Sequence, residues 1–241
     1  MKRNPFTCLV LLWRVLVALT LLILSANVPS LEAAPEPRIP TPLGFIEGSG
    51  LSEAIRAMGI AGQPPSARLV GLYYPTNALA EILNKGFSPP SPFCKAMIKG
   101  QYRSVSDAKK AFQTLVSNAK KESDKPFDPN SSAVKRIFKS YESAARNVDP
   151  SVSVKGKGIS FLGTILEKER VFATSALLNI GWSDGQSQVD MPFAVALAWI
   201  RFGDTQAEFG VLYPFRDATS VSSANAKLLE WIGEIEKRNP N

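Results

Sequence analysis

The sequence predicts an α+β fold, in which helices pack on a mostly antiparallel sheet that ends in a meander of four strands. Apolar residues recur at helical spacing in two stretches between positions 106 and 146. From Val152 onward they form four strand-like segments, grouped as two successive hairpins with short polar turns. Successive hairpins form antiparallel meanders, and amphipathic helices pack on another surface. Together the two patterns favour a layered domain.

The first 34 residues have the pattern of an export signal. Lys2 and Arg3 give a positive start, Val15–Leu24 is an uninterrupted apolar run, and small residues follow as far as Ala34. The alternative is an uncleaved membrane anchor at residues 9–24, although a span needs about 20 apolar residues and the clean run is shorter. In both cases the positive start stays inside, so the folded part is expected in the periplasm or outside the cell.

The rest of the chain predicts one domain preceded by a tether. Pro35–Pro42 is proline-rich, and such stretches are stiff and extended, so residues 35–50 are expected to link the export segment to a single domain at 51–241. Without the first 34 residues, 25 basic residues stand against 20 acidic ones, a net charge of +5. This excess favours contact with anionic surfaces without specifying one.

Six elements are expected before the meander. They are a helix over Leu51–Met58, a strand over Arg68–Tyr74, a helix from Thr76 or Asn77 to Gly86, a strand over Phe93–Tyr102, a helix capped by Ser106, and a helix after the break at Pro126–Asn130. In the second strand, Cys94, Ala96 and Ile98 share one face. Lys95 and Lys99 share the other, so this strand is expected to be half-buried.

Four strands and one helix complete the domain. The strands are expected over Ile159–Leu166, Val171–Ile180, Val189–Ile200 and Gln206–Tyr213, and the helix begins at Ser220, Ser222 or Ser223 with Leu228, Leu229, Trp231, Ile232 and Ile235 as its apolar positions. The stretch Lys155-Gly156-Lys157-Gly158 lacks the spacing of a phosphate loop and is interpreted as a flexible strand edge.

The carboxy-terminal end resembles that of exported PsbP-like domains. A last strand, FGVLYPF at Phe209–Phe215, runs into a polar stretch and then the helical sequence ANAKLLEWIGEIEK, and the resemblance covers about Ile159–Lys237. It implies an α/β/α sandwich and a small accessory or binding protein rather than an enzyme, and no site residue carries over from it. From LVGLYYP onward the chain is also similar to uncharacterised bacterial exported proteins, which adds no chemistry.

Histidine is absent from the 241 residues, which excludes several kinds of site. Ser-His-Asp and Cys-His catalytic pairs and His-ligated metals need it. No cluster of acids with calcium-loop spacing occurs either, so neither a metal nor another cofactor is expected. Outside the export segment the single cysteine is Cys94, which is expected to be a small buried residue, with pairing between chains as the alternative.

Two further functional interpretations come from the residues. Ser-x-x-Lys occurs at Ser106–Lys109, Ser117–Lys120 and Ser132–Lys135, the spacing used by Ser/Lys hydrolases. Ser106 and Ser132 also stand where helix caps belong, which explains them without catalysis, so no catalytic residue is assigned. The aromatic and aliphatic residues of the last four strands permit a carrier of a small apolar ligand, although an ordinary core needs the same residues.

The basic stretch between Lys95 and Lys139 is the main candidate for binding. It holds eleven basic residues against four acidic ones, a net charge of +7. The candidate binding residues on its two helices are Lys109, Lys110, Lys120, Lys121, Lys135, Arg136, Lys139 and Arg146. Two cationic helix faces can bind an envelope protein or the headgroups of an anionic lipid or glycolipid, and a solvated surface is the alternative. Nucleic acid is not expected, because the chain has no nucleic-acid-binding motif.

Overall fold

An antiparallel sheet organises the part of the chain that the computed structural model describes, which is residues 36–85, 91–123, 128, 130–147, 150–183 and 187–240. Its elements are β1 (Phe45–Glu47), α2 (Glu53–Ile60), β2 (Arg68–Pro75), α3 (Leu79–Lys85), β3 (Phe93–Gln101), α4 (Val105–Ser123), α5 (Ser132–Arg146), β4 (Ser153–Glu167), β5 (Val171–Ser183), β6 (Gln188–Phe202), β7 (Thr205–Pro214) and α6 (Ala218–Arg238). The seven strands lie in the order β1-β2-β3-β7-β6-β5-β4, and every neighbouring pair is antiparallel. The predicted α+β fold and its carboxy-terminal meander are confirmed. The export signal expected at residues 1–34 lies outside the described residues.

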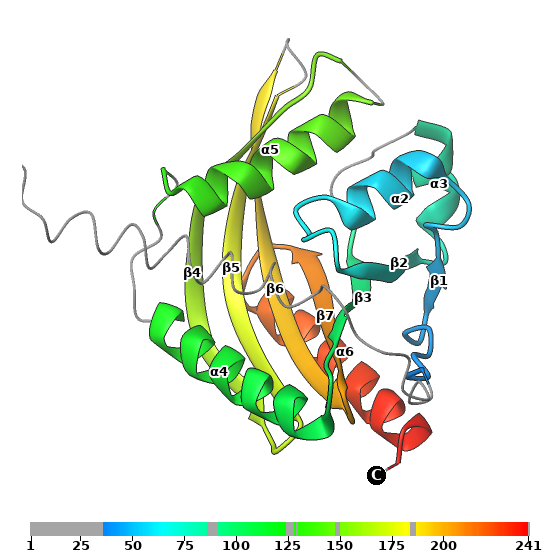
Figure 1. Cartoon of the computed structure of the whole chain (residues 1–241). Helices are drawn as coiled ribbons and strands as arrows, with labels where there is room; N and C mark the ends of the chain where they lie inside the picture. Colours follow the sequence, from blue (N-terminus) through cyan, green and yellow to red (C-terminus); the bar gives the residue numbers. More distant parts are fainter. Residues whose placement is uncertain are drawn as a thin grey trace, which may run out of the picture. The chain divides into compact units, whose positions relative to one another are not determined.

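One face of the sheet is covered by α6, which lies behind the sheet in Figure 1. Trp231 is 1% exposed, and its ring meets those of Phe209 and Tyr73 edge to face, with centroids 5.2 and 5.5 Å apart. Cys94 and Ala96, which were predicted to share one face of their strand, both belong to the core under this helix. Alanines also make up much of the sheet surface below α6, at positions 96, 173, 194, 196, 198 and 207. Small side chains let the helix approach closely, and burying each large side chain of α6 contributes about 2 kcal/mol.

The other helices lie on the opposite face, in front of the sheet in Figure 1. On α5, Phe138 and Ala145 pack against Val152 and Val154 at the start of β4. At the other end of β4, α4 crosses near the strand ends, where the side-chain amide of Gln206 donates to the carbonyl of Ala108 at 3.3 Å. The two amphipathic helices therefore occupy opposite ends of one face.

Strand β4 is longer than expected because residues 153–158 also pair with β5. The stretch Lys155–Gly158, which was interpreted as a flexible strand edge, is part of this pairing. The register of the pairing shifts between Gly156 and Gly158. A Cβ atom built on Gly156 would lie 2.2 Å from the Phe138 ring, so α5 requires a glycine at this position. The glycine therefore permits close helix packing.

The helix caps differ from those expected. The hydroxyl of Ser104, not of Ser106, accepts from the amide of Asp107 at the start of α4. Asp217 caps α6, and Ser220 lies inside the first turn as its capping-box partner. The predictions for α4 and α6 both placed the cap inside the helix. Several serines stand close together in each stretch, and only a residue with a non-helical backbone can cap.

Residues 38–43, which belong to the expected tether, are bound along α6. The amide of Arg38 donates to the side-chain oxygen of Asn239, and the side-chain nitrogen of Asn239 donates to the carbonyl of Arg38, both at 2.8 Å. The Trp231 indole donates to the carbonyl of Pro40 at 2.7 Å, and Lys227 donates to that of Leu43 at 3.1 Å. These contacts fix the point where the chain enters the domain.

Candidate functional site

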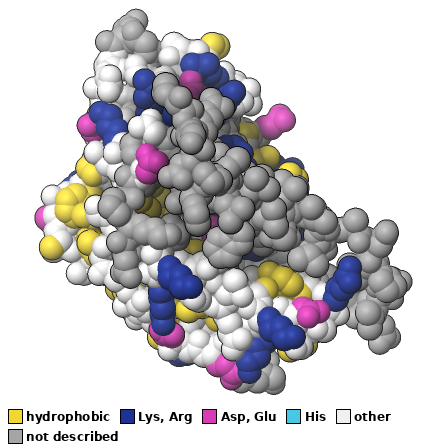
Figure 2. Space-filling view, turned by 60° about the vertical axis from the view of Figure 1, so that its left-hand side comes forward, with side chains coloured by type: hydrophobic (Ala, Val, Ile, Leu, Met, Phe, Trp, Pro, Cys, Tyr) yellow, Lys and Arg dark blue, Asp and Glu magenta, His cyan; other side chains and the backbone are white. Residues whose placement is uncertain are grey.

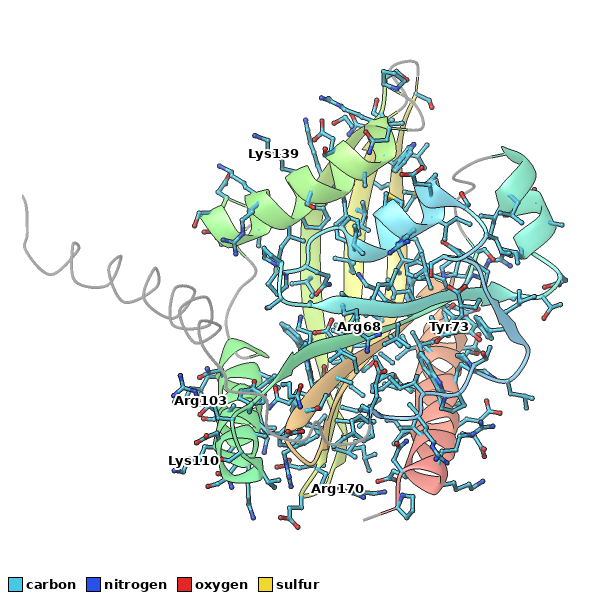
Figure 3. The ribbon with its side chains drawn as sticks, turned by 45° about the vertical axis from the view of Figure 1, so that its right-hand side comes forward. Arg68, Tyr73, Arg103, Lys110, Lys139 and Arg170 are labelled. Carbon is cyan, nitrogen blue, oxygen red and sulfur yellow. The ribbon has the colours of Figure 1, made fainter. Side chains whose placement is uncertain are left out.

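Five of the eight basic side chains expected to bind an anion are exposed and have no ion pair with any described acidic residue. Lys110 and Lys121 lie on α4, whereas Lys135, Arg136 and Lys139 lie on α5. Figure 3 shows Lys110 and Lys139 extending outward from their two helices. These five cations, named here the free cations, form the candidate anion-binding surface.

The other three basic side chains are paired within the molecule. Lys109 pairs with Glu169 at 2.9 Å and Lys120 with Glu167 at 2.8 Å, which links α4 to the turn between β4 and β5. Arg146 pairs with Glu142, and its Nε donates to the carbonyl of Val152 at 2.8 Å. These three residues position their helices, and exposed pairs of this kind contribute at most about 1 kcal/mol each.

The free cations do not form one continuous patch. Because α4 and α5 lie at opposite ends of β4, their cations are separated along the same side of the sheet (Figures 1 and 3). In Figure 2 dark-blue basic side chains are visible in the upper part and in the lower part of the molecule. An extended anionic surface can contact both groups at once, whereas a small ligand can contact only one.

A second set of polar groups lies beneath the helices on the same face of the sheet. The Nζ atom of Lys95 is buried and has no hydrogen-bond partner within the described residues, and it stands 5.9 Å from the centre of the Tyr141 ring on α5. Burial lowers the pKa of Lys95 to about 8, Glu208 acts in the opposite direction, and Lys99 lowers the pKa further. The sequence placed Lys95 opposite Cys94 correctly, but this face is covered.

The carboxylate that raises the pKa of Lys95 is already engaged by other residues. Glu208 accepts from the Trp199 indole at 3.0 Å and pairs with Lys99 at 3.2 Å. Lys99 also donates to the side-chain oxygen of Gln63 at 3.0 Å. We name these six residues the Lys95 cluster: Gln63, Lys95, Lys99, Tyr141, Trp199 and Glu208. Sequence reasoning missed the cluster, since its members come from five separate segments and only the strand alternation around Lys95 gave a signal.

Several residues considered for catalysis have structural roles, whereas neither Ser106 nor Ser132 is the cap of its helix, because Ser104 and Ser131 occupy those positions. Cys94 is 0% exposed, and burial raises the pKa of its thiol, so it is a core residue as predicted. In two of the three Ser-x-x-Lys pairs the lysine, Lys109 or Lys120, is held by a glutamate. Among the described residues, no group of three or more Cys, Asp or Glu could hold a metal ion. No helix in this part of the chain is both long and apolar enough to cross a membrane.

Comparisons with known proteins assign the chain to no family. No family model matches the chain. No curated protein matches it either. Among solved structures, the chain is similar to that of the Ran-binding protein Mog1p from Saccharomyces cerevisiae, with 13% sequence identity over 82% of this chain and 86% of that chain and a TM-score of 0.33. At this TM-score no argument about fold or function rests on the similarity.

Proposed function

We propose that the chain is an exported, non-catalytic binding domain of the PsbP-like kind, which works in a bacterial envelope. In this proposal it docks on an anionic surface or partner through the free cations of α4 and α5. The observation that carries the proposal is that Lys110, Lys121, Lys135, Arg136 and Lys139 are all exposed without an acidic partner among the described residues. The export pattern of residues 1–34 supports a periplasmic or extracellular location.

The charge pattern favours docking on an extended surface. A basic residue close to an anionic membrane contributes about 1 kcal/mol, and this contribution decays within a Debye length of about 10 Å at 0.1 M salt. Because the two groups of cations stand on one side of the sheet, their contributions add when a flat surface approaches that side. The paired residues Lys109, Lys120 and Arg146 add less, because internal carboxylates already neutralise them.

Charge reversal of the free cations tests the proposal. We expect the variant K110E/K121E/K135E/K139E to lose salt-sensitive binding to vesicles of anionic lipid, or to a protein captured from the envelope fraction at low salt. The matched control is R38E/K155E/R216E/R238E, which changes four exposed basic residues away from α4 and α5 by the same total charge. The control should retain most of the binding. Equal losses in the two folded variants would show that only net charge matters and would contradict the proposed surface.

A further inference from the structure

The Lys95 cluster contains one cation more than it can neutralise. Lys95 and Lys99 supply two ammonium groups, and Glu208 is the only carboxylate among the six residues. Lys99 and the Trp199 indole occupy that carboxylate, and Lys99 is further satisfied by Gln63. The excess positive charge therefore resides on Lys95.

The described residues around Lys95 do not satisfy its ammonium group. Lys95 lies in β3 between Leu72 of β2 and Gly210 of β7, so its side chain rises from the middle of the sheet and ends near the Tyr141 ring. An aromatic ring attracts a cation, but it does not replace acceptors for three N–H donors. Buried polar groups in folded proteins almost always have partners, and an unpaired buried charge is the costliest exception.

We propose that the Lys95 cluster binds the anionic group of a small ligand, a carboxylate or a phosphate, between the sheet and α5. An anion at the Lys95 Nζ atom supplies the missing acceptors and neutralises the excess charge of the cluster. At neutral pH the amine is protonated, since its pKa of about 8 stays above 7. The site is separate from the free cations, so it goes beyond the proposed docking and takes a molecule small enough to enter beneath a helix.

Thermal unfolding with added anions tests this site. Inorganic phosphate and acetate are titrated separately at constant ionic strength, and their comparison distinguishes the two kinds of anionic group. For the unsubstituted protein we expect a saturable rise in melting temperature with at least one of them. In Lys95→Met the apparent dissociation constant of the anion should rise by about tenfold or more, because a hydrogen bond to a charged group is lost. The matched control Lys155→Met, which removes an exposed lysine, should respond like the unsubstituted protein.

Two further measurements distinguish loss of the anion site from a folding defect in Lys95→Met and from loss of docking. In the unsubstituted protein, NMR of labelled lysine side chains should show that the pKa of Lys95 rises as the anion binds. This measurement does not depend on the folding of any variant. The charge-reversed variant K110E/K121E/K135E/K139E should retain the anion response, so that loss of docking and loss of this site are distinguishable. An absent response in the unsubstituted protein, or an unchanged response in Lys95→Met, would overturn the proposal.

Discussion

Trp231 joins the main core to the segment that enters the domain. Its ring packs between Tyr73 and Phe209, and its indole N–H donates to the carbonyl of Pro40 at 2.7 Å in a buried environment. Trp231→Phe keeps an aromatic ring but leaves that carbonyl without its donor and leaves part of the volume empty. We expect the free energy of unfolding, measured in urea, to fall by about 1–3 kcal/mol.

Leu229 on the same helix provides the control for Trp231→Phe. Its side chain is 40% exposed, so Leu229→Ala should change the free energy of unfolding by less than about 0.5 kcal/mol. If Trp231→Phe were as stable as Leu229→Ala, the contact with Pro40 would contribute nothing to the fold.

Residue patterns predicted the direction of a side chain better than its partner. Helical spacing placed Trp231 inward, and strand alternation placed Lys95 opposite Cys94. However, Pro40 lies 191 residues before Trp231, in a stretch interpreted as a tether. Tyr141, which approaches Lys95, lies on a helix expected only to pack on some surface. Periodicity within one segment carries no information on which distant segment will cover it.

Among the contacts between elements, the contact of α5 with β4 depends on a glycine, Gly156, which has no side chain. A Cβ atom on Gly156 would lie 2.2 Å from the Phe138 ring, whereas one on Gly158 would meet nothing within 4 Å. We therefore expect Gly156→Ala to displace α5 and lower the free energy of unfolding by about 1–3 kcal/mol. Gly158→Ala, in the same strand, should be within about 0.5 kcal/mol of the unsubstituted protein. Chemical denaturation of both variants makes the comparison, and similar losses would show that α5 does not pack tightly there.

Long periodic elements were predictable, whereas short elements and exact ends were not. Four strands and a helix at the carboxy terminus appear in the predicted order, because each repeats its apolar period several times. β1 has three residues, too few to show a period, and it was missed. The cap of α6 at Asp217 and that of α4 at Ser104 depend on the backbone before the helix, which the clustered serines obscured.

Over the whole molecule, buried ionisable groups contribute to the dependence of stability on pH. The pKa of Lys95 is lowered to about 8, so between pH 8 and its ordinary value near 10.5 the unfolded chain binds more protons than the folded one. The contribution of Lys95 to stability therefore rises with pH across that interval. The groups that face Lys95 are Glu208, Lys99 and Tyr141. Burial, with a smaller contribution from Glu208, raises the pKa of Tyr141 to about 12, so the folded chain keeps its proton above pH 10 and stability falls again.

Urea unfolding at pH 7 and pH 9.5, in a buffer without phosphate or carboxylate, measures this dependence. We expect the change in the free energy of unfolding from pH 7 to pH 9.5 to be more positive by about 2 kcal/mol in the unsubstituted protein than in Lys95→Met, because deprotonation of Lys95 removes the cost of its buried charge. The buried Cys94 thiol, whose pKa is raised, lowers the stability of both proteins toward pH 9.5 and therefore cancels in this comparison. Lys95→Met should already be the more stable protein at pH 7. An equal pH dependence in the two proteins would mean that the Lys95 charge is satisfied without a ligand, which would also remove the physical basis for an anion site between the sheet and α5.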